Sequence, residues 1–460
     1  TATITNVNNV FTITPSTTQA DAGAFSVTFS ASDGSQAATS VSDFTLSFGW
    51  GTASHQQTLV PSIGTTTTGS TNAYARVGSS VAIDGDTLVV GGWGFSGHVW
   101  VFTRSGNTWT EQQQLVASDQ ANGDEFGYAV DISGDTIIIG ARQEEADGTN
   151  HGSVYIFNRS GTTWSQESKL FPSNMGGLNA SSDTSLVHFG ADVAIDGDDI
   201  IIGVPNYDVG ADLNRGASVT ARRTGTTVTN TLGVNQWSTR ISTGGGGGDN
   251  TGEYVDICKD SNGKPVIAIS MNKSDDYASD AGYIAIYKMN PSNTLYSYQG
   301  ALVPSDISAD DRVGRPDLDY YNGSYTLAVG VPYQDTGATN AGAVYIFTST
   351  DGTTWSQQQK IQASSVGNTD YFGVSVSVNG DSLVVGAHRD DDTVTDAGAI
   401  YIFERSGTTW TQSTKLQAPT PEGSGTFGRA VAMSGDYIVV GAQDNPLTAT
   451  LSGASYVYTK

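Results

Sequence analysis

The chain has 460 residues, of which 37% are hydrophobic and 56 are glycine. Acidic residues outnumber basic residues by 46 to 21, which gives a formal net charge of −25. A polyanion of this size repels nucleic acid and anionic membrane surfaces, and no apolar run is long enough to span a membrane, so neither nucleic-acid binding nor membrane insertion is expected. The single cysteine, Cys258, rules out an intrachain disulfide framework and a Cys-based zinc site.

The first 50 residues alternate polar and apolar side chains in steps of two, as in Phe25–Phe29. This alternation predicts β-strands. Two interpretations of residues 1–50 stay open. They form a small attachment segment that contacts other subunits of a virion or filament, or they are a degraded eighth repeat, since Asp21–Phe25 resembles Asp396–Ile400. We favour attachment.

Internal repetition dominates the rest of the chain. One unit opens at Phe126-Gly127, runs through an apolar stretch to Gly140-Ala141, and continues through Val154–Phe157 to Trp164. The same order of residues returns from Phe372-Gly373 onward. Seven copies are present, with spacings between 49 and 63 residues. Their opening glycines are Gly78, Gly127, Gly190, Gly252, Gly314, Gly373 and Gly428.

Each copy contains four strand-like segments, here called A to D. Strand A alternates, strand B is a nearly continuous apolar run such as Ile200–Ile202, strand C alternates again, and strand D is mostly polar. A pair such as Asp84-Gly85 joins strands A and B, which is the preferred hairpin turn because both residues tolerate positive φ. Four strands of decreasing burial, repeated seven times, predict the blades of a propeller.

The seventh copy ends at Lys460 without a strand D. Residues 51–62 are predicted to supply it, because Gln56–Val60 resembles Gln112–Val116. The expected fold is therefore all-β. It is a seven-bladed β-propeller of four-stranded antiparallel blades over residues 51–460, with a short β-rich N-terminal extension at residues 1–50.

The repeated unit resembles the FG-GAP repeat, which forms the propeller of integrin α subunits and of bacterial and phage surface proteins. Phe126-Gly127, Phe189-Gly190, Phe372-Gly373 and Phe427-Gly428 match its first half, and Gly140-Ala141, Gly203-Val-Pro205, Gly330-Val-Pro332, Gly386-Ala387 and Gly441-Ala442 match its second half. The resemblance covers residues 74–460 and implies an extracellular, cell-surface or virion-surface location. Integrin repeats often carry a calcium loop between strands A and B. Here that connection is a bare turn, and the longer Asp260–Lys264 lacks the ligand spacing.

Propeller topology places the short A–B and C–D turns on one face and the long B–C and D–A loops on the other. Variable loops on a rigid scaffold commonly carry binding. The residues just after strand B are predicted to surround the central opening, where aromatic, Arg and His groups suit a glycan or a surface protein. The alternative is that they are ordinary loop residues. The candidates are Trp93, Arg142, Tyr207, Tyr333, His388 and Arg389.

An acidic cluster follows in the loop that contains Asp390, Asp392 and Asp396. Hard cations prefer several carboxylate oxygens on one flexible loop, so these residues are candidate Ca²⁺ ligands. Solvated loop charge is the alternative. No other cofactor is expected.

The sequence lacks a Gly-x-Ser-x-Gly elbow, a His-Glu-x-x-His motif and a phosphate-binding loop. We therefore expect no enzymatic activity, and the favoured function is surface binding or adhesion, for example as a phage tail fibre. A structural subunit of an extracellular filament or capsid decoration is the second hypothesis. A glycan-cleaving enzyme with a hidden pair of carboxylates is the third and least favoured.

Overall fold

The computed structural model describes residues 3–7, 10–14, 23–31, 39–48, 53–62, 75–146, 151–175, 186–208, 213–230, 248–290, 295–365, 367–446 and 452–460. The chain divides into two compact units, one of residues 1–54 with Lys460 and one of residues 55–459. The first unit contains two antiparallel hairpins. They are β1 (Thr3–Val7) with β2 (Val10–Thr14), and β3 (Gly23–Ala31) with β4 (Thr39–Phe48).

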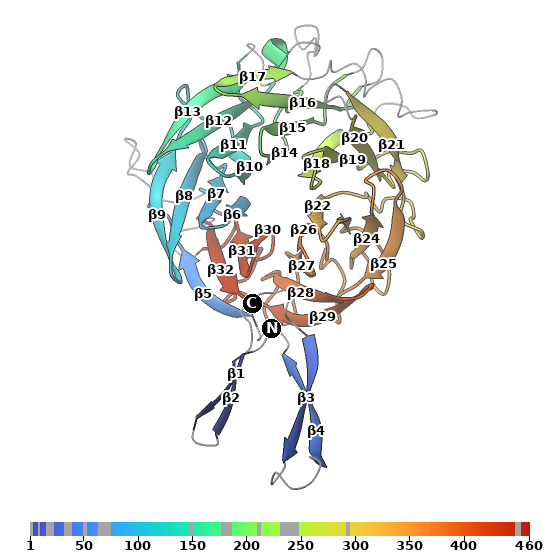
Figure 1. The fold of residues 1–460 in the computed structure, drawn as a ribbon. Helices are drawn as coiled ribbons and strands as arrows, with labels where there is room; N and C mark the ends of the chain where they lie inside the picture. Colours follow the sequence, from blue (N-terminus) through green and yellow to red (C-terminus); the bar gives the residue numbers. More distant parts are fainter. Residues whose placement is uncertain are drawn as a thin grey trace. The chain divides into compact units, whose positions relative to one another are not determined.

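Seven four-stranded antiparallel sheets form a ring in the second unit (Figure 1), which confirms the predicted seven-bladed β-propeller. The strands of each blade follow one another outward from the central channel. Blade 1 has β6 (Ser80–Asp84), β7 (Thr87–Gly92), β8 (His98–Ser105) and β9 (Thr108–Leu115). Blade 2 has β10 (Phe126–Ser133), β11 (Thr136–Ala141), β12 (Ser153–Ser160) and β13 (Thr163–Leu170). Blade 3 has β14 (Val193–Asp196), β15 (Asp199–Val204), β16 (Ala217–Thr224) and β17 (Thr227–Asn230).

The remaining blades repeat this order. Blade 4 has β18 (Thr251–Lys259), β19 (Pro265–Met271), β20 (Tyr283–Met289) and β21 (Tyr296–Leu302). Blade 5 has β22 (Pro316–Tyr321), β23 (Ser324–Val331), β24 (Ala343–Ser349) and β25 (Ser356–Ile361). Blade 6 has β26 (Ser375–Asn379), β27 (Ser382–Ala387), β28 (Ala399–Ser406) and β29 (Thr409–Leu416). A short 3-10 helix, η2 (Pro172–Met175), follows β13.

The last blade is built from both ends of the chain. Its sheet order is β30 (Ala430–Ser434), β31 (Tyr437–Ala442), β32 (Ala454–Thr459) and β5 (Ser54–Leu59). Gln57 in β5 exchanges two hydrogen bonds with the backbone of Trp109 in the next blade, at 2.8 and 2.9 Å. Gln113 makes the same pair of bonds to Trp164. The N-terminal strand therefore occupies the outer position that β9 occupies in blade 1.

The hydrophobic core lies between neighbouring blades rather than inside one sheet. One cluster joins Val89 and Val101 of blade 1 to Ile137, Ile139 and Tyr155 of blade 2. All five side chains are fully buried. Because strand B is covered on both faces by adjacent blades, its sequence is continuously apolar.

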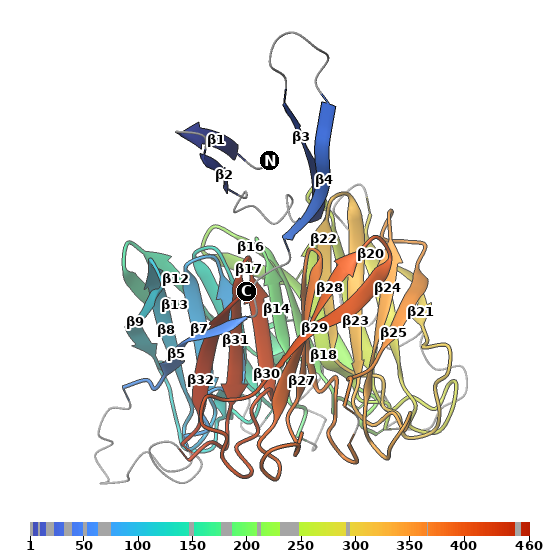
Figure 2. The same cartoon turned by 90° about the horizontal axis from the view of Figure 1, so that it is seen from below.

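The two faces of the ring differ in their connections (Figure 2). Tight turns such as Gly85 and Gly134, both with positive φ, join strands A and B on one face. Longer connections, such as residues 272–282 between β19 and β20, emerge on the opposite face, here called the long-loop face. Strand A of every blade lies innermost (Figure 1), so its inward side chains line the channel.

Candidate functional site

A cavity of about 470 Å³ opens at the channel mouth on the long-loop face. Residues that follow strand B and residues that precede or begin strand A in blades 4 to 7 form its wall. A second cavity of about 150 Å³ lies further along the channel. Five residues border both cavities and form the throat between them. They are Glu253, Tyr254, Arg315, Arg429 and Gln443.

The ring brings some of the predicted ligand-binding residues together and separates others. Tyr333, His388 and Arg389 all line the mouth cavity. Trp93 lines the inner cavity instead. Arg142 borders neither cavity, but it lies 3.6 Å above the ring of Tyr128, which lines the inner one, and it pairs with Glu125 at 2.5 Å.

Tyr207 does not reach the channel cavities. Its half-buried ring packs against the hydrophobic cluster between blades 2 and 3, beside core residues such as Val204 and Phe189. A role for Tyr207 in ligand binding stays a prediction, and its contacts point to packing.

Sequence reasoning missed the throat arginines and their neighbours. Tyr128, Glu253, Arg315 and Arg429 each follow directly after the glycine that opens a repeat. Strand A is innermost, so this position faces the channel in every blade. The sequence did contain a signal for these residues. The opening glycine is present in every repeat, whereas the residue that follows it differs from one repeat to the next.

Charge in the mouth cavity runs opposite to that of the whole chain. Five cationic residues line it, namely Lys273, Arg312, Arg315, Arg389 and Arg429, against two acidic residues, Glu253 and Asp444. Asp444 is already paired with Arg76 at 2.8 Å. The cavity is therefore a cationic site in a protein with a net charge of −25.

Arg315 and Arg429 lie deepest among these cations. Among the described residues, neither has a carboxylate within ion-pairing distance, and Arg315 lies 4.4 Å above the ring of Tyr254. Burial and the positive charge of Arg315 lower the pKa of Arg429. Two like charges held in a partly desolvated channel attract anions more strongly than exposed arginines do.

A chain of rings and cations lines one side of the mouth. Tyr333 and Tyr371 meet edge to face with ring centroids 5.3 Å apart, and Tyr371 stacks on His388 at 5.5 Å. Arg312 lies 5.0 Å from the centre of the Tyr333 ring, and Arg389 lies 5.4 Å from that of Tyr371. Burial, together with the nearby arginines, lowers the pKa of His388 to about 3, so its imidazole is neutral at physiological pH.

Below the throat, strand A carries aspartates that join neighbouring blades. Asp131 accepts a hydrogen bond from the Ile195 amide at 2.7 Å, and Asp192 accepts one from the Val255 amide at 2.9 Å. Two further aspartates make equivalent bonds to the next blade. They are Asp256, to the Leu318 amide at 2.5 Å, and Asp317, to the Val378 amide at 2.7 Å. Burial raises the pKa of all four carboxyls.

The candidate calcium ligands lie around a lysine. Lys415 Nζ pairs with Asp390 at 2.6 Å and with Asp392 at 2.5 Å, and the Tyr401 hydroxyl donates to Asp390 at 2.7 Å. Asp396 adopts a left-handed backbone conformation with φ of 52°. No group of three His, Cys, Asp or Glu side chains suited to a metal ion occurs within the described ranges. Calcium binding stays a prediction, and it requires Lys415 to leave the carboxylates.

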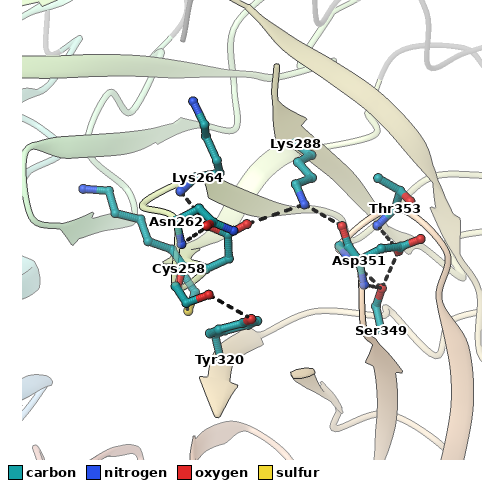
Figure 3. A network of polar contacts seen from close by, with 12 residues as sticks. Cys258, Asn262, Lys264, Lys288, Tyr320, Ser349, Asp351 and Thr353 are labelled. Carbon is teal, nitrogen blue, oxygen red and sulfur yellow. Dashed lines mark hydrogen bonds and ion pairs between the residues drawn. The ribbon is translucent and has the colours of Figure 1, made fainter. Parts of the chain in front are cut away.

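On the opposite face, the carboxylates of two acidic turns accept hydrogen bonds from backbone amides of the same turns (Figure 3). Asp260 Oδ1 accepts hydrogen bonds from the amides of Asn262 and Lys264 at 2.9 Å, and its other oxygen lies 3.8 Å from Lys288. Asp351 accepts from the amides of Thr353 and Thr354 at 2.7 Å. Lys288 also donates to the Asp351 carbonyl at 2.5 Å, so both turns are linked between blades 4 and 5.

Comparison with known proteins supports the repeat and the fold. The FG-GAP repeat family matches residues 109–157, 355–403 and 410–458. Each match begins in the outer strand of one blade, or one residue before it, and ends in the third strand of the next, so the family unit spans a blade junction. No curated protein matches the chain. Among the described residues, no helix is long and apolar enough to cross a membrane.

Two solved structures align with most of the chain. A protein named as a candidate 6-phosphogluconolactonase from Bacteroides uniformis aligns with a TM-score of 0.50 at 13% identity, over 78% of this chain and 90% of that chain. Sqt1 from Saccharomyces cerevisiae aligns with a TM-score of 0.45 at 10% identity, over 84% of this chain and 96% of that chain. At these identities the likeness concerns the fold alone.

Proposed function

We propose that this chain, a β-propeller with FG-GAP repeats, is a non-enzymatic surface protein that recognises a glycan or a protein through its long-loop face. FG-GAP propeller proteins are typically extracellular or surface-exposed. We place this one on a cell or on a virion appendage such as a tail fibre.

The mouth cavity is the observation that carries this proposal. Its volume of about 470 Å³ falls within the range of small-molecule and cofactor sites, about 300–1,000 Å³. Its wall combines arginines, tyrosines and a neutral histidine contributed by different blades. Binding groups on a rigid ring lose little conformational entropy when a ligand binds, which favours recognition.

A binding screen tests this function. The labelled full-length chain is applied to a glycan array and to an array of surface proteins, beside the variants Arg389→Ala and Arg104→Ala. Arg389 is exposed at the mouth. Arg104 pairs with Asp86 near the short turns of the opposite face. We expect Arg389→Ala to weaken binding about tenfold and Arg104→Ala to leave it unchanged. Equal loss in both variants, or no ligand on either array, contradicts the proposal.

A structural role is the second candidate, favoured by the N-terminal hairpins. Residues 1–54, with Lys460, form one compact unit, and residues 55–459 form the other. We propose that residues 1–50 attach the protein to other virion or filament subunits. Removing them leaves β5, which begins at Ser54, to complete the last blade. Electron cryo-microscopy of material from the native source should show the full chain in a larger particle and the truncated chain outside it. Equal incorporation of both contradicts attachment.

A further inference from the structure

We propose that the mouth cavity binds an acidic saccharide, whose anionic group is held at the throat by Arg315 and Arg429. This inference rests on the proposed binding function and names the class of ligand. The shared chemistry is one carboxylate or sulfate group on a sugar.

The mouth cavity has a local excess of cationic side chains. Of the 21 lysines and arginines in the chain, five line this one cavity, whereas acidic residues outnumber basic ones more than twofold overall. An acidic protein surface repels anionic ligands at long range. A cationic cavity in that surface attracts anions locally. An anionic ligand therefore binds at the cavity and is repelled by the rest of the protein surface.

The two throat arginines differ from other arginines near the channel in their ion pairs. Arg76 and Arg142 near the channel each pair with a carboxylate, Asp444 and Glu125 respectively. Arg315 and Arg429 have no such pair among the described residues, although Glu253 lies in the same throat. Burial and the neighbouring charge of Arg315 disfavour the charged form of Arg429 in the free protein and lower its pKa. An anion between the two arginines offsets that effect, and the planar guanidinium matches a carboxylate or sulfate with two parallel hydrogen bonds.

The shape and the polar lining of the cavity favour a saccharide over a protein. A stable protein interface buries about 1,200–2,000 Å² on a broad surface, whereas this site is a recess that narrows to a throat. Three buried polar atoms around it have no hydrogen-bond partner among the described residues, namely Asn272 Oδ1, Arg312 Nε and His388 Nδ1. Buried polar groups normally have partners, and sugar hydroxyls can both donate to the first and accept from the second.

The acidic wall of the inner cavity sets the depth of binding. Asp192 lines that cavity, and Asp131, Asp256 and Asp317 lie on the neighbouring innermost strands. An anion that passed the throat would meet the carboxyl of Asp192, which lines the inner cavity. The acidic group of the ligand therefore stops at Arg315 and Arg429, and the rest of the saccharide extends toward Tyr333 and Arg389.

Isothermal titration calorimetry tests the inference with four probes: trigalacturonate, the neutral galactose trisaccharide, a sulfated galactose trisaccharide and a hexaglutamate peptide. We expect one or both acidic saccharides to bind, with affinity that falls as salt rises because charges are screened. The better of the two assigns the anionic group as a carboxylate or a sulfate. Arg315→Gln and Arg429→Gln should each weaken binding about tenfold to hundredfold, and Arg104→Gln should not.

Thermal unfolding separates loss of binding from loss of folding. Arg429→Gln removes one of two like charges, so its melting temperature should equal or exceed that of the parent chain. Arg429→Lys keeps the charge but loses the two-pronged geometry, so it should fold and bind with intermediate affinity. Lower melting temperatures for both variants overturn the claim that the pair is unfavourable without a ligand.

Other outcomes overturn the inference in distinguishable ways. Equal binding of the neutral trisaccharide leaves the proposed binding function standing and removes the requirement for an anion. Binding of hexaglutamate alone assigns a protein ligand in place of a saccharide. Unchanged affinity for the acidic saccharides in both arginine variants places their site elsewhere. Failure of all four probes, with ligands found on the arrays, overturns the ligand class alone.

Discussion

A Cβ atom on Gly386 would overlap the carbonyl oxygen of Gly428, because the two glycines pack backbone against backbone at the junction of blades 6 and 7. Gly386 ends the apolar run of one repeat, and Gly428 opens the next. The same contact occurs at six of the seven junctions, and in blade 4 the position holds Ser270. The two halves of the repeated motif therefore meet across blades.

Replacing Gly386 should destabilise the ring strongly. Gly386 has an ordinary φ, so Gly386→Ala introduces steric overlap with backbone and no conformational strain. We expect a loss of about 3 kcal/mol in the free energy of unfolding, measured by urea denaturation. Gly423→Ala is the matched control, because its nearest neighbour would lie 3.8 Å away. It should change stability by less than about 0.5 kcal/mol. Similar losses in the two variants would show that the junction tolerates a side chain.

Stability should decrease as pH rises from 4 to 8. Burial raises the pKa of Asp131 and Asp317 to about 7 and that of Asp192 to about 6, from the ordinary value of 3.8. Between these values the folded state binds more protons than the unfolded state, so stability is greatest below about pH 4 and is lost as pH rises through 7. One pKa unit corresponds to about 1.4 kcal/mol, so we expect these groups together to lower the free energy of unfolding by several kcal/mol, measured by denaturation at each pH.

Asp131→Asn identifies the source of this pH dependence. The amide oxygen can still accept the hydrogen bond from Ile195 but has no proton to lose. The variant should therefore show a shallower decrease between pH 4 and 8 than the parent chain. A slope as steep as that of the parent, or stability that rises with pH, would contradict the assignment to these channel carboxyls.

Closure of the ring by β5 predicts a large effect at Leu59. This side chain is 2% exposed and packs in the cluster between blades 7 and 1, beside Val439 and Trp109. Leu59→Ala should lower the free energy of unfolding by about 2–4 kcal/mol. Its neighbour Val60 is 47% exposed, so Val60→Ala should have little effect. A small effect of Leu59→Ala in calorimetry would mean that the ring holds without this strand.

Lys415 should matter more than its counterpart in blade 5. Its partner Asp390 is 1% exposed, so Lys415→Met leaves a buried carboxylate unpaired and should cost about 3–5 kcal/mol. Lys360 has similar exposure, but its partner Asp306 is 48% exposed, so Lys360→Met should cost less than about 1 kcal/mol. Denaturation at pH 8 measures both. Equal costs would contradict the importance of burial at Asp390.

The fold could be predicted because the same sequence pattern recurs in all seven blades. Seven copies of one pattern average out local ambiguity, and an apolar strand B such as Ile200–Ile202 can occur only where neighbours cover both faces. The same reasoning found Tyr333, His388 and Arg389, which lie at the mouth because every strand B ends there. It also named Tyr207, whose ring packs against the hydrophobic cluster between blades 2 and 3, so its role in ligand binding stays a prediction.

The sequence by itself determined the number, order and strand content of the blades, because these depend on local periodicity and on turn residues. Only the tertiary structure decided which side chains share the throat. Arg315 and Arg429 are 114 positions apart, and each follows an ordinary repeat glycine. Both line one cavity because the ring closes and turns strand A of every blade toward a common axis. There the charges of the two arginines act on the same ligand, although neither residue stands out in the sequence.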